Sequence, residues 1–164
     1  MKYYDEIAKG YDELYGEEQK KKWAVAKKLI SVSTIDVVLD LGCGTGIIIP
    51  EIAKQAKMVV GMDLSAGMLE KAPKIGNVIY VLGDAADIPF ENKYFDKVVS
   101  LTMIQDIKEW QPVLAEIKRV CKGEIVLTCL KRGKDIEAIK TRIEKFFKVK
   151  NFIEEEKDYI FLLG

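Results

Sequence analysis

The chain has 164 residues, with 26 Lys and Arg against 26 Asp and Glu, and it contains no histidine. A chain of this length is expected to form one domain of ordinary size, and its hydrophobic content of 49% excludes disorder as the overall state. The lack of histidine excludes Ser-His-Asp and Cys-His nucleophile systems and imidazole-based zinc sites, and the balanced charge argues against a simple polyanion binder.

The predicted elements alternate between helices and strands along the chain. Glu17–Ile30 has a helical pattern, with Trp23, Ala26 and Ile30 on one face. Short β-branched or apolar runs then predict five strands: Val37–Leu41, Met58–Asp63, Val78–Leu82, Phe95–Leu101 and Glu124–Leu130. Helical patterns lie between these runs at three places: Ile47–Ala56, Ala66–Ala72 and Pro112–Cys121.

The C-terminal part continues this alternation and then departs from it. Lys134–Phe147 is predicted to be a helix, and Val149–Ile153 and Tyr159–Leu163 are close enough to form an antiparallel hairpin. The pattern predicts an α/β fold: a doubly wound, Rossmann-like sheet of seven mainly parallel strands with a C-terminal antiparallel hairpin. We expect residues 1–164 to be a single domain, with a helical cap in residues 1–30. A ligand is expected at the carboxyl ends of the parallel strands.

The strongest chemical signal is the segment VLDLGCGTG at residues 38–46. A buried strand here enters three alternate glycines, which allow a tight turn and the close approach of a ligand to the backbone. The dinucleotide fingerprint G-x-G-x-x-G would need a glycine at Ile47, and Asp40 would repel a pyrophosphate. An acidic residue at this place favours a ligand with positive charge, although a NAD-dependent oxidoreductase stays open as an alternative.

This segment resembles the first motif of class I S-adenosylmethionine-dependent methyltransferases, within the branch that includes quinone-biosynthesis and tRNA wobble-uridine enzymes. Four further segments are similar to family motifs in the expected order: VVGMDLS (59–65), GDAADIPF (83–90), FDKVVS (95–100) and EIKRV (116–120). The family commonly has L-K-P-G-G before its fifth strand, whereas this chain has Cys121-Lys122-Gly123-Glu124. This departure concerns the entry to the fifth strand and leaves the residues of the implied cofactor site unchanged.

The resemblance implies S-adenosylmethionine as cofactor, S-adenosylhomocysteine as product, and no metal. Asp63 would accept hydrogen bonds from the ribose hydroxyls, and Asp84 and the Ala85 backbone N–H would bind the adenine. Tyr11 is the candidate lid residue. The other implied cofactor-binding residues surround these and include the glycine loop: Asp40, Gly42, Cys43, Gly44, Thr45, Gly46, Leu64, Met68 and Leu101.

Each of these residues also has a purely structural interpretation. Asp84 and Asp87 favour turns, and Asp63 could support the N-terminus of a helix. Tyr3, Tyr4 and Tyr11 could be core aromatics of a docked helix, and Cys43 could be present only because a small residue is needed there. The Lys20–Lys22 and Lys27–Lys28 clusters are expected to form a solvated helix face.

A reaction driven by an activated cofactor is compatible with a chain that has no histidine, because the protein then supplies mainly orientation and desolvation. The segment after the fourth strand is the place to look for a base: Asp106 is a weak candidate, and Gln105 could donate a hydrogen bond to the substrate. The catalytic residue is otherwise unknown. The acceptor could be a small molecule, a tRNA or a protein, and a partner subunit could complete its site. A non-catalytic cofactor-binding subunit is the remaining alternative.

The cysteines and the N-terminus bear on the cellular compartment. Cys43, Cys121 and Cys129 are widely spaced, so neither a zinc ribbon nor a disulfide framework is indicated. The N-terminal segment MKYYDEIAKG has no apolar core of a signal peptide, and no run approaches 18 apolar residues. These features predict a cytoplasmic protein that does not associate with membranes.

Overall fold

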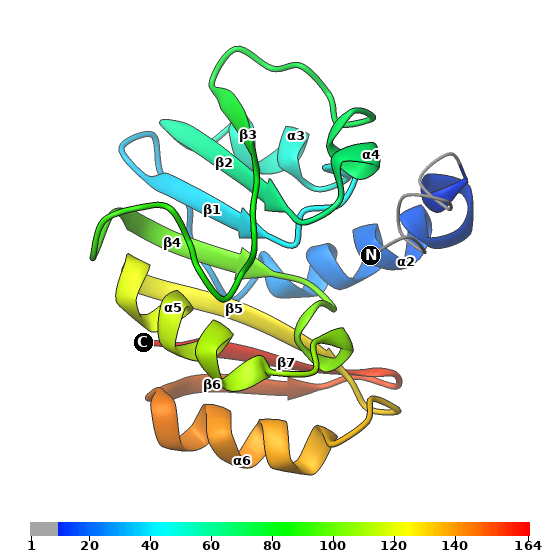
Figure 1. The fold of residues 1–164 in the computed structure, drawn as a ribbon, viewed down its shortest axis with the longest axis vertical. Coiled ribbons are helices and arrows are strands. Elements are labelled where there is room, and N and C mark those ends of the chain that lie inside the picture. Colours follow the sequence, from blue (N-terminus) through cyan, green and yellow to red (C-terminus); the bar gives the residue numbers. More distant parts are fainter. Residues whose placement is uncertain (1–9) are drawn as a thin grey trace.

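The computed structural model describes residues 10–164, and the predictions for Tyr3 and Tyr4 lie outside this range. Seven strands form one sheet (Figure 1). The strands are β1 (Val37–Leu41), β2 (Met58–Asp63), β3 (Val78–Leu82), β4 (Phe95–Ser100), β5 (Cys121–Leu130), β6 (Val149–Glu154) and β7 (Asp158–Leu163). The helices are α2 (Tyr11–Ala26), α3 (Ile49–Ala53), α4 (Ala66–Leu69), α5 (Trp110–Val120) and α6 (Ile136–Phe146), with a short 3-10 helix at Ile104–Asp106.

The strand order is β3-β2-β1-β4-β5-β7-β6, which confirms the predicted fold class. The first five strands pair in parallel, and β7 is antiparallel to both β5 and β6. Because β1 lies between β2 and β4, the chain reverses its direction of winding next to β1. The carboxyl ends of β1 and β4 therefore flank the crevice where a doubly wound sheet binds its ligands.

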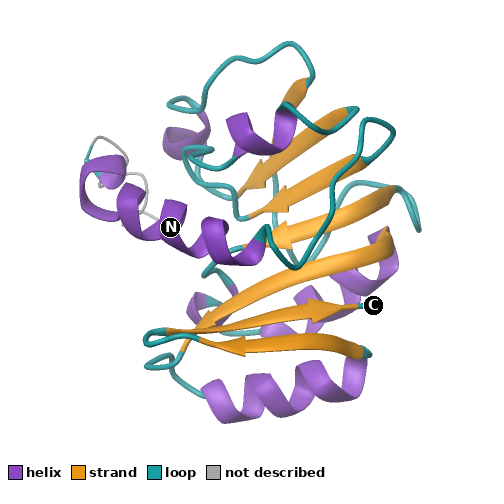
Figure 2. Cartoon of the chain, turned by 180° about the vertical axis from the view of Figure 1, so that it is seen from behind, coloured by secondary structure: helices purple, strands orange, loops and turns teal. Residues whose placement is uncertain are grey.

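Each face of the sheet is covered by helices, as the continuous apolar runs of the central strands require (Figure 2). One core joins the strands to α5 and α6, and it includes Leu39, Val98 and Ile117. The other core joins the opposite face to α2 and α3, and it includes Trp23 and Ile52. The alternation of Val38 and Leu39 between the two cores follows from the twofold side-chain period of a strand.

The predicted helix boundaries were less accurate than those of the strands. Helix α2 begins at Tyr11, six residues before the predicted start, and it ends at Ala26, so Ile30 packs into the core from beyond the helix. Helix α3 begins only at Ile49, because turns follow the glycine loop. Helix ends depend on caps and tertiary contacts that periodicity does not report. Within residues 10–164, the helices are too short or too polar to cross a membrane.

Strand β5 begins at Cys121, three residues before the predicted Glu124. Its pairing with β4 shifts register between Phe95 and Lys97, and Gly123 lies at this irregularity. A Cβ atom added to Gly123 would lie only 2.3 Å from the carbonyl oxygen of Asp96. The absence of a side chain at Gly123 therefore allows β5 to approach the Asp96 carbonyl of β4 this closely.

We expect Gly123→Ala to lower the free energy of unfolding by about 1–3 kcal/mol, since backbone on one side of the clash must move. Thermal unfolding should show a lower Tm than in the wild type. Gly76→Ala is the matched control, because a Cβ there meets no atom within 4 Å. Equal Tm values for Gly123→Ala and Gly76→Ala would contradict this explanation.

Candidate cofactor and acceptor site

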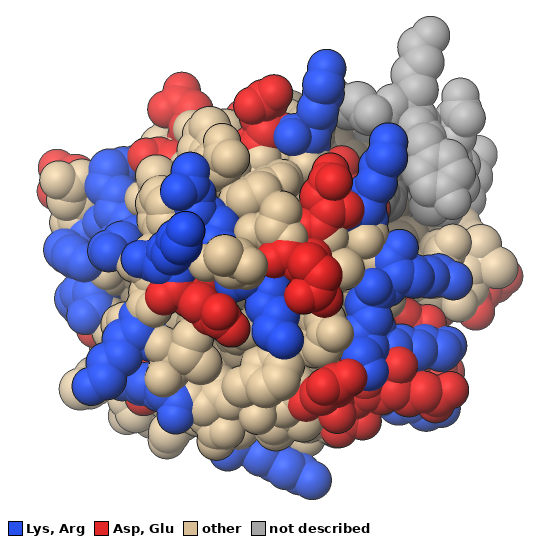
Figure 3. All heavy atoms as spheres, turned by 90° about the horizontal axis from the view of Figure 1, so that it is seen from below, with Lys and Arg blue, Asp and Glu red and all other residues tan. Residues whose placement is uncertain are grey.

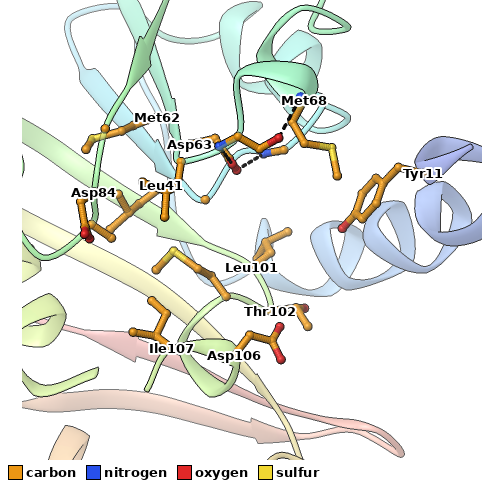
Figure 4. Close-up of a pocket in the computed structure, with 17 residues that line it drawn as sticks. Tyr11, Leu41, Met62, Asp63, Met68, Asp84, Leu101, Thr102, Asp106 and Ile107 are labelled. Carbon is orange, nitrogen blue, oxygen red and sulfur yellow. Dashed lines mark hydrogen bonds between the residues drawn. The ribbon is translucent and has the colours of Figure 1, made fainter. Parts of the chain in front are cut away.

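A cavity of about 330 Å³ lies at the carboxyl edge of the parallel strands (Figure 4). Residues at the ends of β1, β2, β3 and β4, or just after them, line it, together with Tyr11 from α2. The lining residues are Tyr11, Leu41, Gly42, Gly44, Met62, Asp63, Leu64, Ser65, Met68, Gly83, Asp84, Ala85, Leu101, Thr102, Met103, Asp106 and Ile107. Segments more than 90 positions apart in the chain thus meet around one space.

The glycine loop after β1 is shaped by left-handed backbone conformations. Gly42, Gly44 and Gly46 have φ angles of 73°, 55° and 73°, which L side chains rarely adopt. The backbone N–H groups of Gly42 and Cys43 both donate to the carbonyl of Met62, at 2.8 and 3.1 Å. The loop is therefore tied to the end of β2 and leaves Gly42 and Gly44 facing the cavity.

Asp63, the last residue of β2, connects the glycine loop to α4. Its Oδ2 accepts the N–H of Gly44 at 2.8 Å, and its Oδ1 accepts the N–H of Ser65 at 2.9 Å. The Ser65 hydroxyl in turn accepts the N–H of Met68 as the N-cap of α4. Asp63 thus supports the N-terminus of α4, which is the structural role considered from the sequence. A carboxylate offers about four lone-pair positions, so the two oxygens can each accept a further hydrogen bond from a ligand.

The β3 side of the cavity combines one carboxylate with apolar groups. Asp84 lines the cavity, and its Oδ1 accepts the N–H of Ala86 at 2.8 Å, so the turn-forming interpretation is also correct for this residue. Met68 is buried, whereas Leu64 is 45% exposed at the cavity. A flat apolar group with an exocyclic donor would match this combination of methionine, leucine and carboxylate.

Asp40 lies on the other side of the glycine loop, beside a smaller hollow of about 30 Å³ that shares Gly42, Gly44, Tyr11 and Leu101 with the main cavity. Its carboxyl is 2% exposed, and its Oδ2 accepts no hydrogen bond from the described residues. Burial, and secondarily the charge of Asp63, raises the pKa of Asp40 to about 8. A positively charged group entering this hollow would stabilise the ionised form.

The raised pKa of Asp40 predicts a specific pH dependence of stability. From about pH 4 to 8, folded Asp40 holds a proton that the unfolded chain has released, so the free energy of unfolding falls by about 1.4 kcal/mol per pH unit. Above about pH 8 both states are ionised and this contribution stops changing. The side chain of Asp40→Asn does not titrate. In urea unfolding, the free energy of unfolding of this variant should therefore rise relative to that of the wild type as the pH increases from 5 to 8.

The control for this experiment is Asp87→Asn, which removes the charge of an exposed carboxylate. It should follow the wild-type pH profile. If Asp40→Asn also follows that profile, Asp40 does not carry the proton.

Helix α2 places Tyr11 over the cavity and is fastened to the rest of the site by side chains. The Thr45 hydroxyl donates to Asp12 at 2.5 Å, and both Trp23 and Lys27 donate to Glu51 at 3.1 Å. Burial, together with the charge of Asp63, raises the pKa of Tyr11 to about 12. The phenol therefore stays protonated near neutral pH, and Tyr11 can donate a hydrogen bond but does not act as a base.

The remaining wall follows β4 and contains the candidate base. Leu101, Thr102 and Asp106 line the cavity, as Figure 4 shows. Gln105 is outside the lining: its Nε2 donates to the Thr102 carbonyl and to Asp106 Oδ2, both at 2.9 Å. The suggested role of Gln105 as a substrate hydrogen-bond donor therefore has no support from this placement, because the amide group holds Asp106.

Not every predicted site residue borders the main cavity. Thr45 and Gly46 line neither hollow, and Asp40 and Cys43 line only the smaller one. Burial raises the pKa of the Cys43 thiol, which agrees with a packing role. Sequence analysis missed several lining residues: Gln19, Leu41, Met62, Ser65, Gly83, Met103 and Ile107. The positions of Leu41 and Met62 at the ends of adjacent parallel strands were a usable signal, and Met103 and Ile107 lie in the segment after the fourth strand where the sequence already suggested looking for a base.

The donor set of the site matches an organic ligand with positive charge better than a metal ion. Among residues 10–164, no group of three or more Cys, Asp or Glu side chains is arranged to hold a metal. The site offers instead an unpaired oxygen of Asp40 in the smaller hollow, and the carboxylate of Asp63 and an apolar wall at Met68 in the main cavity.

Comparisons with known proteins agree with this geometry. A family profile described as "Methyltransferase domain" matches residues 39–128. The chain is 36% identical over 163 residues to the uncharacterized protein MJ1252 of Methanocaldococcus jannaschii, covering 96% of this chain and 62% of that protein. It is 29% identical to a demethylmenaquinone methyltransferase of Staphylococcus carnosus, covering 98% of this chain and 74% of the relative. The chain thus spans less than two thirds of the Methanocaldococcus protein.

A solved structure with a similar fold comes from the complex between the Haloferax volcanii Trm112 methyltransferase activator and a methyltransferase. The two chains superpose with a TM-score of 0.79, at 17% identity, covering 98% of this chain and 96% of the other. A crystal structure of a S-adenosylmethionine-dependent methyltransferase from Aquifex aeolicus has a TM-score of 0.74 at 18% identity, covering 85% of this chain and 87% of that one. At these low sequence identities, the two comparisons show that the fold is shared and nothing more.

Proposed function

Because the chain belongs to the class I S-adenosylmethionine-dependent methyltransferase family, with its methyltransferase domain over residues 39–128, we propose that the protein moves a methyl group from S-adenosylmethionine to an acceptor. The observation that carries the proposal is the convergence of four motif segments on one cavity. Gly42 and Gly44, Asp63, Asp84 and Leu101 come from the ends of four different strands and border the same space.

Specific residues would hold each part of the cofactor. Asp63 would accept hydrogen bonds from the ribose hydroxyls, and Asp84 from the adenine amino group, with Leu64 and Met68 on the ring. The glycine loop and Asp40 would receive the amino-acid part, whose positive amino group compensates the buried carboxylate. When bound, the cofactor supplies a methyl group already activated by its sulfonium.

The chain's own contribution to the reaction is orientation, desolvation and the handling of a proton. Asp106 is the carboxylate on the acceptor side of the cavity, and it could receive a proton from an acceptor that must be deprotonated. The described lining residues include Asp63, Asp84 and Asp106 but no Lys or Arg. This charge distribution favours an acceptor whose reacting end is neutral or cationic over one that carries a phosphate there.

The acceptor could be a small molecule, a tRNA or a protein. The relatives named demethylmenaquinone methyltransferases make demethylmenaquinone the first small molecule to test. For RNA, the face shown in Figure 3 mixes Lys and Arg with Asp and Glu and does not gather them in one basic patch. A large RNA footprint on that face alone is accordingly disfavoured.

The proposal is tested by cofactor binding and by methyl transfer from the purified chain. Calorimetric titration should show binding of S-adenosylhomocysteine that is tighter than binding of NADH, and tritiated methyl groups should pass into an acceptor fraction of small molecules, RNA or protein. Tighter binding of NADH would favour the oxidoreductase alternative and overturn the proposal.

A partner subunit could complete the acceptor site, which also keeps the non-catalytic alternative open. Leu64 is 45% exposed at the cavity, and Leu82, which precedes the lining residue Gly83, is 59% exposed, so a second protein could cover both. Because one similar fold comes from a complex with an activator protein, copurification should be tested. Transfer only by a complex that contains this chain would support the cofactor-binding-subunit alternative, and transfer by the pure chain would dismiss it.

The three unpaired thiols fit the predicted cytoplasmic location.

A further inference from the structure

Lys22 is a buried lysine behind the acceptor side of the site. Its sequence neighbours Lys20 and Lys21 are exposed on α2, as predicted, but Lys22 is only 5% exposed, so the prediction of a solvated face was wrong for this residue. The Nζ atom donates to Thr102 Oγ1 at 2.8 Å and lies 3.0 Å from Glu18 Oε1 and 3.2 Å from Asp158 Oδ1. One ammonium group therefore joins α2, the segment after β4 and the start of β7.

The charge around Lys22 explains why a buried ammonium is tolerated there. Glu18 lies one turn earlier on α2, and Asp158, which is 4% exposed, begins β7. Asp158 Oδ1 accepts no hydrogen bond with good geometry from the described residues, so charge attraction holds it to Lys22. Two carboxylates and one hydroxyl thus compensate the burial of a single positive charge.

Thr102, the hydroxyl partner of Lys22, has an unusual backbone conformation. Its φ angle is 58°, in the left-handed region that β-branched residues rarely adopt. The N–H of Thr102 donates to Thr128 Oγ1 at 2.9 Å, and its carbonyl accepts from Gln105 Nε2 at 2.9 Å. Such a conformation persists only when surrounding groups fix it, and Lys22 is one of these groups.

The same contacts continue to the candidate base. Gln105 Nε2 also donates to Asp106 Oδ2 at 2.9 Å, and both Thr102 and Asp106 line the cavity. A continuous series of hydrogen bonds therefore leads from Lys22 through Thr102 and Gln105 to Asp106. Tyr11, on the opposite wall, is carried by the helix that carries Lys22.

We propose that Lys22 is a positioning residue that holds the Thr102–Asp106 segment against α2, so that Asp106 faces the acceptor from a fixed place. This inference rests on the proposed function, because it assigns a role on the acceptor side of the same site. Lys22 does not line the cavity, and its contacts do not include the Asp63 and Asp84 carboxylates. Its effect is therefore expected on the acceptor side and not on the cofactor side.

The test compares Lys22→Met, which keeps the aliphatic stem, with Lys21→Met on the exposed face of the same helix. Hydrogen exchange of the bonded amides of Thr102, Asp106 and Ile107 should become at least about tenfold faster in Lys22→Met and stay unchanged in Lys21→Met. Affinity for S-adenosylhomocysteine should stay within about threefold of the wild type, and kcat for methyl transfer should fall at least about tenfold at an unchanged KM for the cofactor. Unchanged exchange at these amides, or equally faster exchange throughout the sheet, would overturn the proposal.

Two further variants separate positioning from a general loss of stability. Thr102→Val replaces the hydroxyl with a methyl group and keeps the β-branched shape, so it should accelerate exchange of Asp106 and Ile107 as Lys22→Met does, and the two changes together should add little. Thr102→Gly in the Lys22→Met background should partly restore slow exchange, because glycine adopts a positive φ without strain. Fully additive effects of Lys22→Met and Thr102→Val on exchange would contradict the proposal. Unchanged fast exchange in the Lys22→Met variant that also carries Thr102→Gly would contradict it too. Failure of the wild type to bind S-adenosylhomocysteine would overturn the proposed function and leave the exchange measurements to decide the role of Lys22.

Discussion

Asp63→Ala is expected to weaken binding of S-adenosylhomocysteine by at least about 100-fold. The carboxylate would lose charge-assisted hydrogen bonds to the two ribose hydroxyls, each worth about 1.5–3 kcal/mol. The variant also leaves the N–H groups of Gly44 and Ser65 without their acceptor, which loosens the glycine loop that approaches the ligand. Calorimetric titration measures the loss directly.

Two variants control this experiment. Asp63→Asn keeps the shape and one acceptor oxygen, so its affinity should lie between those of the wild type and Asp63→Ala. Asp87→Ala removes an exposed carboxylate that does not line the cavity, and it should bind as the wild type does. Thermal unfolding should show that Asp63→Ala is folded at the titration temperature. Affinity of this variant within threefold of the wild type would remove Asp63 from the cofactor site.

Gly42→Val is expected to lose cofactor binding and about 3 kcal/mol of stability. The φ angle of 73° costs an L residue about 1–2 kcal/mol, and overpacking adds about 1–3 kcal/mol. A Cβ at this position would lie 2.7 Å from Met103 Sδ and 3.0 Å from Met103 Cβ. Because the contact reaches the Cβ atom, Met103 cannot avoid it by moving only the end of its side chain, and the cavity wall must shift.

The matched control for Gly42→Val is Gly76→Val. Gly76 has no atom within 4 Å of an added Cβ and is not among the glycines with positive φ. Urea unfolding and titration with S-adenosylhomocysteine should leave Gly76→Val close to the wild type. If the two valine variants had the same stability and affinity, neither the backbone conformation nor the contact with Met103 would limit this position.

The strands were the part of the fold that sequence analysis predicted best. The predicted bounds of β1, β2 and β3 agree with the structure, because each is a short apolar or β-branched run; β1 and β2 are buried, and β3 is the half-exposed edge strand. The predicted beginning of β5 was wrong, because β5 already starts at Cys121, which pairs with Phe95 before a shift in register. Such an irregularity depends on the neighbouring strand and leaves no periodic signal in the β5 sequence.

Part of the site could also be predicted. The positions of Gly42, Asp63 and Asp84 at strand ends made their convergence predictable, because parallel strands end at the same edge of a sheet. Met103 and Ile107 line the cavity without such a signal, because they flank the short 3-10 helix that comes after β4. Thr102, the residue before Met103, has a left-handed conformation, which no local pattern predicts.

The sequence by itself thus determined the class of fold, the order of its elements and several of the residues that line the cavity, because hydrophobic periodicity and glycine spacing are local properties of the chain. Only the tertiary structure decided which charged groups are buried. Lys22 meets a hydroxyl 80 residues away, and Asp40 becomes a carboxyl with a raised pKa when the sheet and helices exclude water from it. Burial and the electrostatic consequences of burial depend on contacts between distant segments, and composition and spacing do not contain them.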